Sequence, residues 1–82
     1  MFAILTKAVD GRRFDRYFRE FKNARTEMMN EVEGIIKKYG CKRRNSTDRL
    51  NVEKGIYELE ETIVTDDDTR FVWAILGGYF QD

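Results

Sequence analysis

The chain has 82 residues, which suffices for one domain and is too short for two. Its 15 Lys and Arg balance 15 Asp and Glu, and 41% of its residues are hydrophobic, so a small folded core is expected. The absence of histidine and the single cysteine exclude a Ser-His-Asp or Cys-His catalytic set, His-ligated zinc and an intrachain disulfide.

The start of the sequence does not have the pattern of a secretory signal, because no basic segment precedes a run of about 7–15 apolar residues. The longest apolar run, 71–80, is about half as long as a bilayer-spanning helix. The lone Cys41 lies beside three cationic residues, which fits a reducing compartment. These features predict a cytoplasmic protein without a membrane partner.

Two segments near the N-terminus have different hydrophobic periods. Residues 2–9 are apolar at nearly every position and end at the turn dipeptide Asp10-Gly11, which predicts a buried, central strand. From 12 to 39 the apolar residues fall within a stripe about 140° wide at 100° per residue, which predicts one long amphipathic helix. Asp10 is expected to cap its start and Gly40 to end it.

The segment after Gly40 is mostly polar. Residues 41–49 are basic and show no apolar period, which predicts a loop. Leu50 and Val52 alternate with polar residues before the turn signal at 53–55, so a short edge strand is an option there.

The C-terminal part is predicted to form two strands. Residues 56–65 alternate between apolar and polar positions, which is typical of a half-buried strand. Residues 70–80 are apolar on both sides, which favours a central strand, and the acidic triplet 66–68 forms the loop between the two.

The sequence therefore predicts one α+β domain over residues 1–82. The expected order is β-α-(β)-β-β, with one antiparallel sheet of three to four strands and the single long amphipathic helix packed across one face. The first and last strands are expected at the centre of the sheet, side by side, because both are apolar on two sides.

Two features of this prediction favour a homodimer. A helix over 12–39 would be about 42 Å long, which exceeds the diameter of roughly 30 Å expected for a compact chain of this size. The last strand has two apolar faces, but one helix covers only one of them. We therefore expect self-association through the uncovered sheet face or the helix end. In the alternative, the helix bends at Gly34 and wraps around the sheet.

Several arginines are candidates for binding an anion. Arg25 lies near the middle of the apolar stripe, where it either holds an anion or packs its stem on the core with its head in solvent. Arg12, Arg16 and Arg19 share the polar face of the predicted helix, and with the basic loop they form a candidate surface for phosphates. A solvated charged face is the other interpretation, because no RNA- or DNA-binding motif is present.

The acidic residues between 55 and 68 are a weak indication of chemistry. Three consecutive aspartates lack the spacing of a calcium loop, and no partner residue supports acid–base catalysis by Glu58 and Glu60. Solubilising charge on a strand and a turn is the more common role. We expect no cofactor, no metal, no catalytic residue and no enzymatic activity.

The pattern predicts a small non-enzymatic protein-binding module, a homodimer that modulates a larger protein partner as an accessory factor. Phage-borne inhibitors of host proteins are one such class by analogy. The expected partner-binding residues are Asp66, Asp67, Asp68, Lys42, Arg43 and Arg44. The alternative is a nucleic-acid or nucleotide-phosphate binder that uses the basic helix face and the basic loop.

Overall fold

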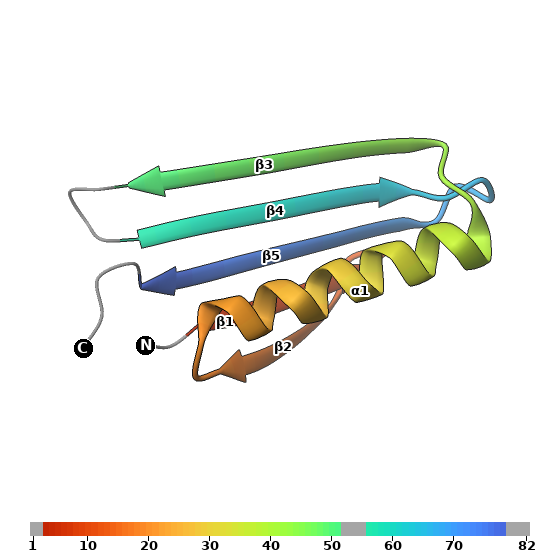
Figure 1. Cartoon of the computed structure of the whole chain (residues 1–82). Helices are drawn as coiled ribbons and strands as arrows, with labels where there is room; N and C mark the ends of the chain where they lie inside the picture. The colour runs from red at the N-terminus through yellow and green to blue at the C-terminus, as the bar shows by residue number, and fades with distance from the viewer. Residues whose placement is uncertain (1–2, 52–55, 79–82) are drawn as a thin grey trace.

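The computed structural model describes residues 3–51 and 56–78 (Figure 1). In chain order these ranges contain β1 (Ala3–Val9), β2 (Arg12–Phe18), α1 (Phe21–Tyr39), β3 (Arg43–Asn51), β4 (Ile56–Val64) and β5 (Arg70–Gly78). The strands form one antiparallel sheet in the order β2-β1-β5-β4-β3, and α1 packs across one face. The α+β class with a single helix is confirmed for the described residues, but the sheet has five strands rather than three to four.

The predicted helix over 12–39 is wrong in its first part, where the chain forms a second strand. Asp10 and Gly11 have φ angles of 49° and 86°, and Val9 is paired with Arg12. Positive φ at both central residues is typical of the two-residue turn that closes a hairpin. Asp10 therefore does not cap a helix. Its Oδ1 instead accepts a hydrogen bond from the backbone N–H of Arg70 at 3.0 Å.

The aromatic residues of 12–18 explain why a helical period was predicted. Phe14, Tyr17 and Phe18 have helical spacing, but aromatic side chains also favour strands. In β2, Phe14 and Phe18 lie on one face and Tyr17 on the other, and Tyr17 is 73% exposed. The helix begins only after Glu20, so its 19 residues span about 28 Å and the predicted overhang does not arise.

Helix α1 packs on the sheet through Ala24, Met28 and Val32, which are four residues apart and therefore share one face. The helix ends at Gly40, as predicted, and the N–H of Gly40 donates to the Ile36 carbonyl at 2.9 Å. Gly40 has a φ of 79°, which favours glycine. A Cβ at this position would also displace the exposed Asp66 carboxylate.

The core lies between α1 and the sheet. The first and last strands are adjacent at the centre, which confirms the prediction made from their two apolar sides. The buried apolar cluster comprises Ala3, Leu5, Ala24, Met28, Val32, Leu59, Ile63, Phe71, Trp73 and Ile75. Trp73 is the largest fully buried side chain and lies on β5 beneath the helix.

The predicted loop at 41–49 is wrong, because β3 begins at Arg43 and pairs with β4 along its whole length. An edge strand with polar side chains has no hydrophobic period by which it could be found. The short strand considered at Leu50 falls within β3. Val52, the predicted turn at 53–55 and the last residues of the predicted strand, 79–80, lie outside the described residues.

Candidate functional site

The sheet has one face that α1 does not cover, and we call it the open face. Successive residues of a strand point to opposite sides, so the neighbours of buried Leu5, Trp73 and Ile75 belong to this face. Its centre, on β1 and β5, is a small apolar band formed by Ile4, Ala8, Val72, Ala74 and Leu76. The apolar second side predicted for the last strand is this band. At one end of it, opposite Ile4, Leu76 is 49% exposed.

A groove of about 410 Å³ runs across the open face. Its lining is apolar in the middle and polar at both sides, where β2 contributes Arg13 and β3 and β4 contribute Thr47, Arg49, Glu58 and Glu60. The volume is near the lower end of the range for ligand pockets. An apolar centre with a polar rim is also the usual anatomy of a protein interface.

Each polar flank of the open face carries charges of both signs. On β2, Arg13 Nε lies 3.1 Å from Asp15 Oδ1, and the hydrogen bond from Arg13 holds the pKa of the Asp15 carboxyl below its ordinary value. On the other flank, Arg49 of β3 is the direct cross-strand partner of Glu58 of β4. Mixed charge of this kind suits a partner with both acidic and basic side chains better than a polyanion.

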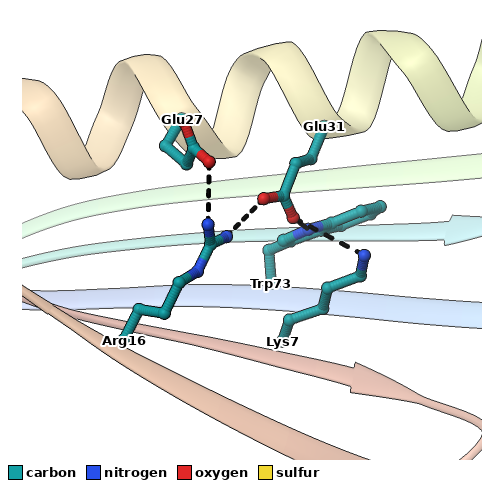
Figure 2. Close-up of polar contacts among 5 residues, drawn as sticks. All are labelled: Lys7, Arg16, Glu27, Glu31 and Trp73. Atoms are coloured by element: carbon teal, nitrogen blue, oxygen red, sulfur yellow. Dashed lines mark hydrogen bonds and ion pairs between the residues drawn. The ribbon is translucent and has the colours of Figure 1, made fainter.

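Beneath the helix, a network of charges centred on Glu31 joins α1 to the sheet (Figure 2). Glu31 Oε1 accepts a hydrogen bond from Trp73 Nε1 at 3.1 Å and lies 3.6 Å from Lys7 Nζ. Its other oxygen accepts from Arg16, and Arg16 also donates to Glu27 Oε2 at 2.7 Å. Figure 2 shows these side chains converging from β1, β2, β5 and α1.

The network settles the ionisation of Glu31. Partial burial raises the pKa of its carboxyl, but the hydrogen bonds from Arg16 and Trp73 outweigh burial, and the pKa falls below its ordinary value of 4.5. The same carboxylate raises the pKa of the Arg16 guanidinium. Every charge in the network has a partner inside the chain, so the network is a structural clamp between helix and sheet.

A second carboxylate, which is more deeply buried than Glu31, lies on the same side of the sheet at β4. Glu61 is 6% exposed, and its two oxygens accept hydrogen bonds from Arg44 Nε at 2.9 Å and Ser46 Oγ at 2.7 Å. These contacts tie the polar edge strand β3 to β4. The Arg44 guanidinium, which was predicted to bind a partner, is therefore engaged within the chain.

The predicted acidic and basic recognition segments come together at one end of the molecule. Lys42 Nζ lies 2.8 Å from Asp68 Oδ1, and the Lys42 N–H donates to the Val64 carbonyl at 2.7 Å. In the turn between β4 and β5, Asp67 accepts a hydrogen bond from Thr65, which lowers the pKa of the Asp67 carboxyl. The segments form one mixed-charge end rather than two separate surfaces.

The predicted arginine surface is not assembled as expected, because Arg12 and Arg16 are on β2 instead of the helix. Arg16 is engaged by Glu27 and Glu31. Arg19 is exposed between β2 and α1, and Arg25 is exposed on α1, which is compatible with the interpretation that places its head in solvent. Sequence reasoning missed Arg13, Thr47 and Arg49 as groove residues, because their strands were not recognised.

Residues 3–51 and 56–78 contain no group of three or more His, Cys, Asp or Glu side chains that could bind a metal ion. Within the same ranges, no helix is long and apolar enough to cross a membrane. No family model, no curated protein and no solved structure matches the chain. Function must therefore be inferred from the chemistry of the open face.

Proposed function

We propose that this chain is a small non-enzymatic protein-binding module that holds part of a larger protein partner on its open face and thereby modulates that partner. The observation that carries the proposal is the apolar band around Leu76 and Ile4, at the centre of a sheet face without a covering helix. Apolar surface of this kind gains free energy when a partner removes it from water.

The flanks of the open face favour a protein over a nucleic acid. Single-stranded nucleic acids bind to sheets through aromatic side chains on which bases stack. Among the described residues the open face has one aromatic residue, Tyr17 on the edge strand β2, and none on the central strands β1 and β5. Glu58 and Glu60 place negative charge beside the groove. Arg16 and Arg44 are already paired with carboxylates, which weakens the nucleic-acid alternative.

The mixed-charge end has a secondary role in this proposal. Its exposed charges, on Lys42, Arg43 and the acidic turn 66–68, steer the partner towards the groove by long-range attraction. Neutralising them is expected to slow association and to reduce its dependence on salt, with little effect on dissociation.

Site-specific crosslinking tests the open face directly. A photoreactive residue at position 76 is expected to capture one partner from an extract of cells that express the chain, whereas the same residue at exposed position 26 on α1 is not. In affinity pull-downs with the chain that lacks the photoreactive residue, Leu76→Glu is expected to abolish capture of the same partner, because it places a charge in the apolar band. Thr26→Glu is the matched control. Capture that survives Leu76→Glu would contradict the proposal.

We also propose that the module is a homodimer.

A further inference from the structure

Strand β2 is a free edge of the sheet. Among the described residues it pairs only with β1, and no helix or loop pairs with its outer side. Residues 12–17 are all exposed, and the seven-residue strand contains no proline, although four of its residues are charged, namely Arg12, Arg13, Asp15 and Arg16. Proteins usually protect such an edge with charges, prolines or bulges, because an unpaired strand readily accepts another strand.

The main-chain groups available on this edge follow from the hairpin. In a two-residue turn the closing residues, Val9 and Arg12, form a hydrogen-bonded pair. Hydrogen-bonded residues alternate along an antiparallel strand, so the N–H and C=O groups of Arg13, Asp15 and Tyr17 point away from β1. These three residues present the outer edge with donors and acceptors that only another strand can satisfy in a regular ladder.

The side chains of β2 are complementary to β2 itself. When the strand is paired antiparallel with a second copy about Asp15, every arginine stands opposite an aromatic residue. The opposed pairs are Arg13 with Tyr17, Phe14 with Arg16, and Arg12 with Phe18. Directly opposed residues lie on the same face at Cβ separations of about 4.5–5.5 Å, which brings a guanidinium onto a ring. Within one copy, Arg12 already lies 5.7 Å from the Phe14 ring centroid.

We propose that β2 is the homodimer interface, and that two copies of the chain pair through their β2 strands, antiparallel and in register about Asp15. The main chain permits this register, because it pairs Arg13, Asp15 and Tyr17, whose N–H and C=O groups point outward, with one another. Among the registers that pair these residues, the opposition of arginines and aromatic residues favours the one centred on Asp15.

The centre of this interface brings the two Asp15 carboxylates opposite each other. Like charges in that position repel, but each Asp15 is paired with Arg13 of its own copy at 3.1 Å. Arg13 of the second copy is the diagonal neighbour on the same face, within reach of a long side chain. Two carboxylates and two guanidiniums thus form a balanced cluster on the two-fold axis.

The other edge of the sheet does not have this property. Strand β3 carries Arg43, Arg44, Asp48 and Arg49, has no aromatic residue and has Leu50 as its one apolar residue, so pairing it with itself opposes mainly polar groups. Pairing β2 of one copy with β3 of the next would leave free edges at both ends and would build a fibre instead of a closed dimer. Self-pairing of β2 closes after two copies.

The dimer would extend the open face. A two-fold axis perpendicular to the sheet joins two five-stranded sheets into one and places both helices on the same side. The two apolar bands then lie on the other side of one continuous sheet, uncovered. The apolar band is separate from this interface, since Leu76 on β5 is separated from β2 by β1, whereas Arg13 of β2 belongs to both the groove lining and the interface.

Sedimentation velocity on the full chain tests the interface through opposed positions 13 and 17. We expect a concentration-dependent dimer for the wild type. Arg13→Glu places a carboxylate near both Asp15 residues, and Tyr17→Lys opposes two cations. The dimer contains two symmetric rows, in each of which residue 13 of one copy stands opposite residue 17 of the other. Each change therefore acts twice and is expected to raise the dissociation constant of the dimer about 30-fold. Circular dichroism and the fluorescence of the single Trp73 confirm that the variants fold.

A mixture of the Arg13→Glu and Tyr17→Lys variants tests the predicted register most directly. In the heterodimer one row pairs the new carboxylate with the new ammonium, and the other keeps the native Arg13–Tyr17 pair. Association is expected to return to within about threefold of the wild type. Thr47→Lys on the β3 edge and Leu76→Glu on the open face are expected to leave the dimer unchanged.

Three results would overturn the interface. They are a wild-type monomer at high micromolar concentration, a dimer unaffected by both β2 variants, or a failure of the mixed variants to associate. Dissociation by Leu76→Glu alone would assign the dimer to the open face instead. If Leu76→Glu abolishes partner capture and leaves the dimer intact, both proposals are supported. Partner binding on the open face and dimerisation through β2 can therefore be tested separately.

Discussion

The two faces of the sheet are built from the same strands but differ in burial, because α1 covers only one of them. On β5, Trp73 is fully buried beneath α1, whereas Leu76, three residues later on the opposite face, is 49% exposed. Both side chains are strongly apolar, so hydrophobicity alone does not determine burial here. The position of the single helix in the described residues decides which face becomes core and which remains uncovered.

The faces also differ in how they treat charge. On the covered face, Glu31 and Glu61 are held by donors from several elements, as buried carboxylates require. On the open face, Asp15 is paired with Arg13 on its own exposed strand, and Glu58 stands opposite Arg49. Charges on the covered face fix the fold, and those on the open face remain available to a partner.

The largest contrast is expected from truncating one large side chain on each face. Trp73→Ala removes a fully buried indole and the hydrogen bond to Glu31, and should lower the free energy of unfolding by about 3–5 kcal/mol. Leu76→Ala should lower it by only about 0.5 kcal/mol. Urea denaturation followed by circular dichroism measures both. Similar losses for the two variants would contradict the division into core and open face.

Replacing two glycines by alanine is expected to change the stability of the chain by smaller amounts and in opposite directions. A Cβ at Gly77 would lie 2.5 Å from Phe21 Cδ2, so Gly77→Ala should destabilise the chain by about 1–3 kcal/mol. Gly34 is exposed on α1 with nothing within 4 Å of its Cβ position, and Gly34→Ala should stabilise by up to about 1 kcal/mol. Thermal melts of the two variants should therefore shift in opposite directions.

Acid should act on the covered face through Glu31. Its pKa is lowered in the folded chain, so its contribution to stability is present above the ordinary value of 4.5 and is lost as the pH falls through the folded pKa. Glu31→Gln should cost about 1 kcal/mol at neutral pH, and the difference from the wild type should shrink below pH 4.5. Urea titrations across this range test it, and a difference independent of pH would refute the role assigned to this carboxylate.

The smallest effect is expected on the open face. Glu58→Gln removes an exposed charge opposite Arg49 and should change the free energy of unfolding by no more than about 0.5 kcal/mol. The same variant should measurably weaken partner binding, because Glu58 lines the groove. Destabilisation as large as that of Glu31→Gln would show that Glu58 serves the fold.

The sequence predicted the parts of the fold that are rich in apolar side chains. The two central strands were found because they are apolar on both sides, and the strand at 56–64 was found because its apolar and polar residues alternate. Strand β2 was missed because Phe14, Tyr17 and Phe18 also fit a helix. Strand β3 was missed because a polar edge has no apolar period.

The same limit applies to the candidate site. The apolar second side of the last strand predicted the centre of the open face, since residues such as Ala74 and Leu76 have no place in a one-helix core. The flanks depend on Arg13, Thr47 and Arg49, whose direction follows only from the pairing of β2 and β3. Nor does any local pattern show that Glu31 reaches Trp73, which is 42 residues away.

Thiol labelling at two adjacent positions tests the division between the faces most directly. In a Cys41→Ser background, Leu76→Cys and Ile75→Cys place single thiols on opposite sides of β5. The thiol at position 76 is expected to react near the rate of an unfolded peptide. The thiol at position 75 is expected to react about a hundredfold or more slowly, because its reaction requires local opening of the fold. Equal rates, or a thiol at position 76 that is protected in the isolated chain, would contradict an open face available to a partner.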